Sequence, residues 1–292
     1  MHKPDLCVDL HCHSTASDGV LSPAELLARA AERGVTHLAL TDHDTLAGLA
    51  EARQAAQDCG VHLINGIELS CQWRQHTIHV VGLDVRDDDA PFLARVTQQT
   101  ENRWARARLI ADRLERLKVP DLVDRATAQA GGSVPGRPHF AAALVEAGAV
   151  KSPAQAFKRH LGAGKPGDVR AFWPPLEDVV AWILEAGGVP VLAHPRKYKM
   201  TATRLRDLVR DFQEAGGQGL EVMTSGQSPA DLSFLADLCE KRGLWASQGS
   251  DFHFPGAPWC ELGQGMGQAL RLPDRLEPVW RHFRAPVVQP GG

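Results

Sequence analysis

Imidazole and carboxylate side chains stand directly after several predicted strands. They are His11 and His13 after the run 7–10, Asp42 and His43 after 38–41, Glu68 after 61–67, His194 after 189–193, and Asp251 with His253 after a run that ends near Ser247, while His79 lies within the run 77–83. Like charges repel, and buried polar atoms left unpaired cost about 1–3 kcal/mol each, so such a cluster needs compensation. Divalent cations supply it, because neutral imidazole and carboxylate suit Zn²⁺, Mn²⁺ and Fe²⁺. The set therefore predicts a multinuclear metal site.

The individual motifs differ in strength. His11 and His13 lie on the same side of an extended chain, so both can reach one site, although two surface histidines would give the same pattern. The motif around His43, which follows an apolar run, is stronger. Asp18 taken alone is a turn residue. The joint placement at strand ends, rather than any one motif, carries the prediction.

Short apolar runs alternate with helical stretches over the first 85 residues and again after about residue 170. Ser22, Pro23 and Glu25 form a capping box that opens a helix ending at Gly34. The predicted strands are 6–10, 38–41, 61–67, 77–83, 189–193, 220–223 and 244–247, and further helices are expected at 46–58, 176–186, 203–215 and 229–241. Strands followed repeatedly by helices imply parallel βαβ units in an α/β barrel or a doubly wound sheet. In a barrel, the residues past the strand ends converge on one face.

The segment 90–167 shows helical signals and turns without a convincing strand, so we expect a helical insertion there. This segment is also basic, since residues 95–170 hold 14 Lys and Arg against 7 Asp and Glu. The formal net charge of the whole chain is −3, so the remainder carries −10. A basic segment in an acidic body favours an anionic ligand between them. A solvated, arginine-rich helical face would explain the charge equally well.

The composition excludes several classes of protein. The chain has 292 residues, of which 43% are hydrophobic and 23% charged, so it is neither a disordered chain, a collagen-like fibre nor a coiled coil. No apolar run reaches the roughly 18 residues that span a bilayer. The six cysteines form no Cys-x-x-Cys pair, and residues 1–5 lack a signal-peptide profile, so we expect a cytoplasmic protein.

Several motifs point to one family. They are Val8-Asp9-Leu10-His11-Cys12-His13-Ser14, Ser17-Asp18-Gly19, Leu40-Thr41-Asp42-His43-Asp44, Gly66-Ile67-Glu68, His79, Ala193-His194-Pro195 and Gly249-Ser250-Asp251-Phe252-His253. In these motifs the chain resembles the PHP (polymerase and histidinol phosphatase) phosphoesterase family. The motifs at 136–140, 164–167 and 217–222 resemble its nucleoside 3′,5′-bisphosphate phosphatase and RNase AM branch. The resemblance implies an α/β fold, a distorted TIM-like (β/α)₇ barrel formed by residues 1–89 and 168–292. The basic helical insertion 90–167 would cover its active site.

The same resemblance implies three divalent metal ions, with Mn²⁺ expected first and Zn²⁺, Fe²⁺ or Mg²⁺ as alternatives. The first ion would be held by His11, His13, Glu68 and Asp251, the second by Asp18, His43 and His253, and the third by Glu68, His79 and His194. His43, Asp251 and His253 are the expected catalytic residues. Asp42 would orient a ligand imidazole from behind.

Substrate phosphates would be held by Arg137, His139 and Lys165 of the insertion, together with Arg196 or Lys197. The last choice stays open because this branch reads His-Pro-x-Arg-Tyr, whereas the chain has Lys197 in that register and Arg196 one position early. Lysine lacks the bidentate fork of arginine. Without the resemblance, Arg137 and His139 would simply be residues at the start of a helix.

The expected activity is hydrolysis of nucleotide phosphate esters by attack of a metal-bound hydroxide on phosphorus. The substrate would be the 3′-phosphate of a nucleoside 3′,5′-bisphosphate, or short 5′-phosphorylated RNA cleaved from 5′ to 3′. Two alternatives remain: a small-metabolite phosphatase of the histidinol-phosphate type, and a non-catalytic metal-binding module. No membrane association and no obligate protein partner are expected.

Overall fold

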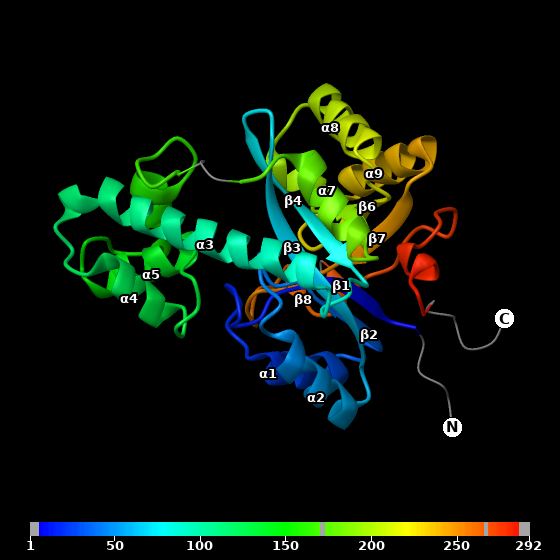
Figure 1. The fold of residues 1–292 in the computed structure, drawn as a ribbon, viewed down its shortest axis with the longest axis horizontal. Helices are drawn as coiled ribbons and strands as arrows, with labels where there is room; N and C mark the ends of the chain where they lie inside the picture. Colours follow the sequence, from blue (N-terminus) through cyan, green and yellow to red (C-terminus); the bar gives the residue numbers. More distant parts are fainter. Residues whose placement is uncertain (1–5, 170–172, 266–267, 286–292) are drawn as a thin grey trace.

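The computed structural model describes residues 6–169, 173–265 and 268–285. A curved sheet carries helices on its outer side, and a long helix leads away from it into a separate group of helices (Figure 1). No helix among the described residues is both long enough and apolar enough to cross a membrane.

Seven strands form the main sheet, and they follow one another in the order of the sequence. They are β1 (Val8–Cys12), β2 (His37–Leu40), β3 (His62–Trp73), β4 (His76–Leu83), β5 (Val189–Leu192), β6 (Gly219–Thr224) and β7 (Trp245–Gly249). Neighbouring strands are parallel except that β4 is antiparallel to both β3 and β5. The prediction of parallel units was therefore wrong for β4. Only Arg74 and Gln75 separate it from β3, and a parallel partner needs a crossover of a dozen or more residues.

The sheet is nearly closed into a barrel, because the segment after β7 returns to β1. The backbone N–H of Asp251 donates to the carbonyl of His11 at 2.8 Å, and that of His13 donates to the carbonyl of Phe252 at 2.9 Å. The side chain of Gln248 donates to the carbonyl of Val8 at 2.8 Å. This closure confirms the barrel prediction. It also places His11 and His13, near the start of the sequence, beside Asp251, near residue 250.

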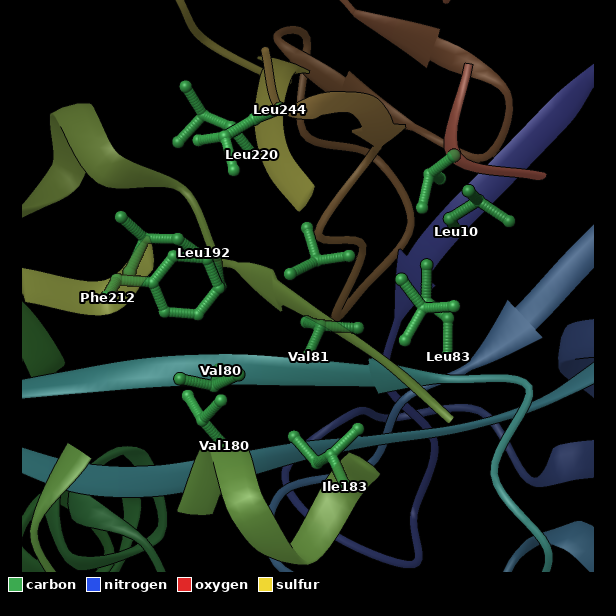
Figure 2. Packing of buried hydrophobic residues seen from close by; sticks show 14 of the residues in the cluster. Leu10, Val80, Val81, Leu83, Val180, Ile183, Leu192, Phe212, Leu220 and Leu244 are labelled. Atoms are coloured by element: carbon green, nitrogen blue, oxygen red, sulfur yellow. The ribbon is translucent and has the colours of Figure 1, made fainter. Parts of the chain in front are cut away.

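Five helices cover the sheet: α1 (Pro23–Glu32), α2 (Leu49–Cys59), α7 (Leu176–Glu185), α8 (Ala202–Glu214) and α9 (Pro229–Arg242). The predicted capping box of α1 is confirmed, since Ser22 and Glu25 bond each other's backbone N–H groups. Val180 of α7 points toward Val80 of β4, Ile183 faces the same strand near Gly82, and the labelled side chains belong to one buried cluster (Figure 2). Burial of such side chains, at about 25 cal/mol per Å² of apolar surface, fixes the helices on the sheet.

Residues 90–167 form helices and turns, as predicted: α3 (Ala90–Arg113), the 3₁₀ turn η1 (Glu115–Leu117), α4 (Leu122–Gln129), α5 (Arg137–Glu146), α6 (Pro153–Ala156) and the π-helical turn η2 (Phe157–Leu161). The N-terminal half of α3 lies against the barrel, and its other half carries α4 and α5 away from it (Figure 1). These helices pack around a hydrophobic cluster of their own that includes Ile110, Phe140 and Leu144.

A second sheet of three short strands, β8 (Cys260–Glu261), β9 (Gln264–Gly265) and β10 (Gln268–Ala269), was not anticipated. Strands of two residues leave no alternation of apolar and polar residues to detect. Pro286, Pro290 and the two final glycines predict a loose tail, and residues 286–292 lie outside the described residues.

Candidate metal centre

The structure brings all nine predicted ligand side chains together at one end of the barrel. They fall into four overlapping groups in which the potential ligand atoms lie within 4.8 Å of one another: His13, Asp18, His43 and His253; His11, Glu68 and His194; His11, His13 and Asp251; and His43, Glu68 and His79. Every group shares a member with another group. The arrangement is one continuous site rather than several separate ones.

Glu68 lies at the centre of this cluster, in the middle of β3. Its Oε2 atom lies 2.9 Å from His43 Nδ1 and 3.3 Å from the Nε2 atoms of both His11 and His13. Its Oε1 atom lies 2.9 Å from His79 Nδ1 and 2.8 Å from His194 Nε2. Because the two oxygens face different imidazoles, Glu68 joins the two halves of the cluster.

Two aspartates flank Glu68. Asp251 Oδ1 lies 3.3 Å from His13 Nε2 and 3.6 Å from His11 Nε2. On the other side, Asp18 Oδ1 lies 3.3 Å from His253 Nε2 and 3.9 Å from His43 Nε2. The turn that carries Asp18 is therefore part of the site, although its sequence alone is that of an ordinary turn.

The electrostatic environment divides the cluster: the pKa values of the three carboxylates and of His13 and His79 are lowered, whereas neighbouring carboxylates raise the pKa values of His11, His43 and His253 against the effect of burial. Burial alone would raise the pKa of Glu68, but His43 and the other imidazoles lower it well below its usual value. Burial, with His253 and His43 nearby, lowers the pKa of His13 to about 3. Burial would also lower the pKa of His253, but Asp18 raises it to about 9. At neutral pH Glu68 is thus ionised and His13 neutral, whereas the raised pKa values of His11, His43 and His253 favour protonated rings, which must lose a proton before they can bind a cation.

Unpartnered polar atoms test whether these residues fit a metal. Eleven buried side-chain N and O atoms of the described residues have no hydrogen-bond partner, and seven of them belong to the cluster. These seven are His11 Nε2, His13 Nδ1 and Nε2, Asp18 Oδ1, His43 Nδ1, Glu68 Oε2 and His194 Nδ1. Such atoms are costly unless something binds them. Imidazole nitrogens and carboxylate oxygens aimed at a common space fit divalent cations.

Glu221 supports the cluster and was missed by the sequence analysis. One carboxylate oxygen lies 3.0 Å from His11 Nδ1, and the other accepts the backbone N–H of His194 at 2.5 Å. It therefore fixes the ring of His11 and the backbone of His194 together. Its position inside β6, rather than after the strand, is why the strand-end pattern did not find it.

Asp42 lies beside the site, but its partners differ from the prediction. Its Oδ1 accepts the backbone N–H of Ser14 at 2.7 Å and the hydroxyl of Ser17 at 2.6 Å, and its Oδ2 accepts the hydroxyl of Ser14 at 2.7 Å. Both oxygens of Asp42 thus accept hydrogen bonds from these two serines rather than from an imidazole. Asp42 thus holds the turn that presents Asp18 instead of orienting a ligand ring.

The backbone is strained where it delivers two of the side chains. His194 has φ 28° and Asp251 has φ 53°, in the left-handed region that such residues rarely adopt. Conformations of this kind cost about 1–3 kcal/mol and cluster at functional sites. Gly249 permits the approach of β7 to β1, because a Cβ there would lie 2.3 Å from the Cβ of His11.

The predicted phosphate-binding residues occupy different places. Lys197 forms an ion pair with Asp251 at the cluster. Arg196 instead pairs with Asp231 of α9 at 2.5 Å and lies over the ring of Phe234. Of the two alternatives left open by the sequence, Lys197 is therefore the one at the metal centre.

The insertion contributes residues at varying distance. His139 accepts the N–H of Gly136 at 3.0 Å, and a Cβ on Gly136 would lie 3.9 Å from Asp18 Oδ2, so this helix start lies close to the cluster. Arg137 lies 3.7 Å from Asp168, and its side chain also reaches the carbonyl of Leu161. Lys165 is exposed on a turn.

A hollow of about 200 Å³ lies between the cluster and α3, and two of the side chains that line it were not predicted from the sequence. Asp18 and His43 line one side, and Arg103 and Trp104 of α3 line the other. In the sequence, only the basic charge and the aromatic residue of this segment could have drawn attention to Arg103 and Trp104. Helix α3 thus forms one wall of the space next to the candidate site.

Comparison with known proteins agrees with this geometry. Residues 9–128 match the PHP domain family. The chain is 42% identical over 284 residues to the 3′,5′-nucleoside bisphosphate phosphatase of Chromobacterium violaceum, covering 97% of this chain and 98% of that protein. It is 44% identical over 281 residues to the 5′-3′ exoribonuclease Rnm of Escherichia coli, covering 95% and 94% of the two chains. A solved structure described as an amidohydrolase from C. violaceum, with bound sulfate and no metal, superposes with a TM-score of 0.85 at 42% identity and 98% coverage of both chains. Similarity along the whole chain shows that the protein belongs to the PHP family of phosphoesterases.

Proposed function

We propose that this protein is a metal-dependent phosphoesterase that removes the 3′-phosphate of nucleoside 3′,5′-bisphosphates. The observation that carries the proposal is the set of buried, unpartnered imidazole and carboxylate atoms at one end of the barrel. The name of the C. violaceum relative, at 42% identity, supports the substrate. The sulfate bound in the similar solved structure supports it too, since sulfate resembles phosphate in shape and charge.

Three divalent ions would be held by the nine side chains of the cluster, with Mn²⁺ as the first expectation. Glu68 would be shared between ions, because its two oxygens face different imidazoles. When bound, such ions supply a hydroxide nucleophile at neutral pH and neutralise charge on the phosphoryl oxygens. His43, Asp251 and His253 would be catalytic, since each lies at the open side of the cluster, next to a hollow.

The basic residues would bind and orient the substrate. Lys197 would meet the phosphoryl group being transferred, because it is the cation in contact with Asp251. His139 would bind nearby, beside Asp18. Arg137, Lys165 and Arg196 would act on the outer phosphate, which requires Arg137 and Arg196 to exchange their present carboxylate partners.

We further propose that residues 1–89 and 168–292 act as one barrel, with 90–167 as an insertion that covers the site. The separate hydrophobic cluster of the insertion supports this division. So does the hollow between α3 and His43, which would exclude bulk water from the phosphate once substrate fills it.

A second activity, 5′→3′ cleavage of short 5′-phosphorylated RNA, has its own support. Hollows flank the cluster on two sides, one beside Asp18 and His43 and the other beside Asp251 and His253. A phosphate with a nucleotide on each side would need this arrangement. The name of the E. coli relative agrees with that activity.

Phosphate release from a panel of substrates tests the proposal. The panel contains adenosine 3′,5′-bisphosphate, adenosine 3′- and 5′-monophosphates, histidinol phosphate and short 5′-phosphorylated RNA, each with Mn²⁺, Zn²⁺, Mg²⁺ or chelator. We expect fastest release from the bisphosphate with Mn²⁺ and none with chelator. His43→Ala should lose at least about a hundredfold in kcat, while His62→Ala, an exposed histidine at the start of β3, should not.

Other outcomes would replace the proposal. Preference for histidinol phosphate would identify a small-metabolite phosphatase. Absence of turnover with every metal, in protein that binds metal tightly, would identify a non-catalytic module. Equal turnover in His43→Ala and the wild-type protein would place the chemistry outside this cluster.

A further inference from the structure

A second hollow opens on the other side of the metal centre and has a different lining. Its volume is about 610 Å³. Lys197, Asp251 and His253 form the part next to the cluster, and Phe254 and Trp259 form the outer part. A charged inner end and an aromatic outer end thus share one space. Volumes of this size are typical of sites for small organic ligands.

The two aromatic side chains are unusually exposed. The exposed large hydrophobic residues among those the structure describes are Val20, Leu93, Phe254 and Trp259. Phe254 is 50% exposed and Trp259 is 54% exposed. Half the members of this small set therefore lie in the hollow beside the metal centre. Exposed aromatic rings grouped at a site are typical of a binding surface rather than of packing.

The chemistry of the hollow matches one part of a nucleotide. A phosphoryl group at Asp251 and His253 would leave the attached nucleoside to extend outward along the lining. The outer lining offers aromatic faces, and every nucleobase has a flat π face that stacks on such rings. The smaller hollow on the α3 side is a weaker match, because its volume is about 200 Å³ and its Arg103 is already paired with Asp44.

We infer that Phe254 and Trp259 bind the base of the nucleotide substrate by stacking, on the Asp251 side of the metal centre. The inference rests on the proposed function and adds the residues that recognise the nucleoside. Stacking tolerates any base, since it uses the ring face rather than the hydrogen-bonding edge. The enzyme should therefore discriminate nucleotides from phosphate esters without a base, and discriminate only weakly among bases.

Kinetics with and without a base on the substrate test the inference. The pair is adenosine 3′,5′-bisphosphate and 1-deoxyribose 3,5-bisphosphate, which keeps the sugar and both phosphates but lacks the base. Trp259→Ala and Phe254→Ala should each lower kcat/KM for the adenosine compound about tenfold, mainly through KM. Both should leave kcat/KM for the base-free compound within about twofold of the wild-type value. Trp259→Phe should retain most of the activity.

Leu93→Ala is the matched control, since it removes an exposed apolar side chain from α3 in a hollow that contains none of the nine cluster residues. This variant should leave kcat/KM unchanged for both compounds. Equal losses on both compounds in the aromatic variants, or no loss on either, would overturn the inference. So would a change in the oligomeric mass of Trp259→Ala without altered selectivity, because the rings would then belong to an interface between copies of the chain.

Failure of the proposed function has a separate signature. Wild-type protein that releases no phosphate from adenosine 3′,5′-bisphosphate would overturn that function. Calorimetry would then measure how tightly the metal-loaded protein binds the same compound, and this affinity would decide the inference. Weaker binding by Trp259→Ala than by wild type would support base stacking, and equal binding would overturn it.

Discussion

Two glutamates in the metal centre have different tasks at the level of single side chains. Glu68 faces imidazoles with both oxygens and has an oxygen without a hydrogen-bond partner, which is the arrangement expected of a cation ligand. Glu221 has both oxygens engaged, on His11 and on the backbone of His194. Glu221 would therefore act on bound cations only through the ring and the backbone that it holds.

Glu221→Gln should weaken metal binding without abolishing it. The amide keeps the shape of the side chain but removes the charge that increases the basicity of His11. We expect metal affinity to fall about tenfold to a hundredfold, as is typical when a partner of a ligand is changed. Metal retained during titration with chelator measures this loss.

The activity of Glu221→Gln should return when excess metal is added, and Glu214→Gln on α8 should behave like wild type. Low activity that excess metal does not restore would mean that Glu221 has some other role.

Seven of the nine ligand candidates could be found from the sequence because each is a His, Asp or Glu just after an apolar run, whereas Asp18 in a turn and His79 within a strand were assigned as ligands from the family resemblance. Glu221 lies inside its strand, and its contact with His11 joins residues 210 positions apart. Local sequence patterns carry no information about such a pair. The same holds for the choice between Arg196 and Lys197, which depends on the direction of each side chain in the short helix after β5, η3 (Pro195–Tyr198).

At the scale of the elements, one buried carboxylate joins α3 to the barrel. Asp44 is fully buried after β2 and has φ 52°. It accepts from Arg103 Nε at 2.5 Å, from the side chain of Gln99 at 3.0 Å and from the backbone N–H of Ser70 at 2.7 Å. Two of these donors come from α3 and one from β3. The pairing of this buried charge thus helps to hold α3 on the barrel, together with the burial of Phe92 and Val96 in the main hydrophobic cluster.

Arg103→Ala should destabilise the protein by about 3–5 kcal/mol, because it leaves the Asp44 carboxylate buried without its cation. The free energy of unfolding in urea measures this. The double variant Asp44→Asn, Arg103→Ala should recover part of the loss, since it removes the unpaired charge.

Arg108→Ala, farther along α3, provides a control that leaves Asp44 untouched and should unfold like the wild-type protein. A double variant no more stable than Arg103→Ala would contradict the account of the buried charge.

The elements themselves were largely predictable. The capping box at Ser22 and the helices of residues 90–167 follow from local signals, and both were found. The C-terminal end of β3 was not predicted correctly. The prediction stopped at Ile67, whereas the strand continues to Trp73 because antiparallel pairing with β4 extends it. Pairing between strands, rather than local sequence preference, sets that boundary.

For the molecule as a whole, the metal centre links most of the main sheet. Its candidate side chains come from the ends or interiors of β1 to β5, from the turn between β1 and α1 that carries Asp18, and from the segment after β7. Cations bound there would connect segments from residue 11 to residue 253. A ligand that binds the folded state but not the unfolded state also stabilises a protein. The gain is about 2.7 kcal/mol when the free ligand concentration is a hundred times its Kd.

Removal of metal should therefore lower the melting temperature. Chelator-treated protein should melt about 5 °C or more below the same protein with Mn²⁺ restored. Differential scanning fluorimetry measures the shift. His43→Ala should show a clearly smaller response to Mn²⁺, and His62→Ala the full response. An identical melting temperature with and without Mn²⁺ would contradict metal binding by the folded protein.

The contact between β1 and the segment after β7 has a consequence for biosynthesis. His11 and His13 are synthesised long before Asp251, which lies beside them in the folded protein. Until the segment after β7 has been made, the two histidines lack this carboxylate neighbour. Loading of metal into the complete candidate site would therefore have to wait until these two distant segments have met.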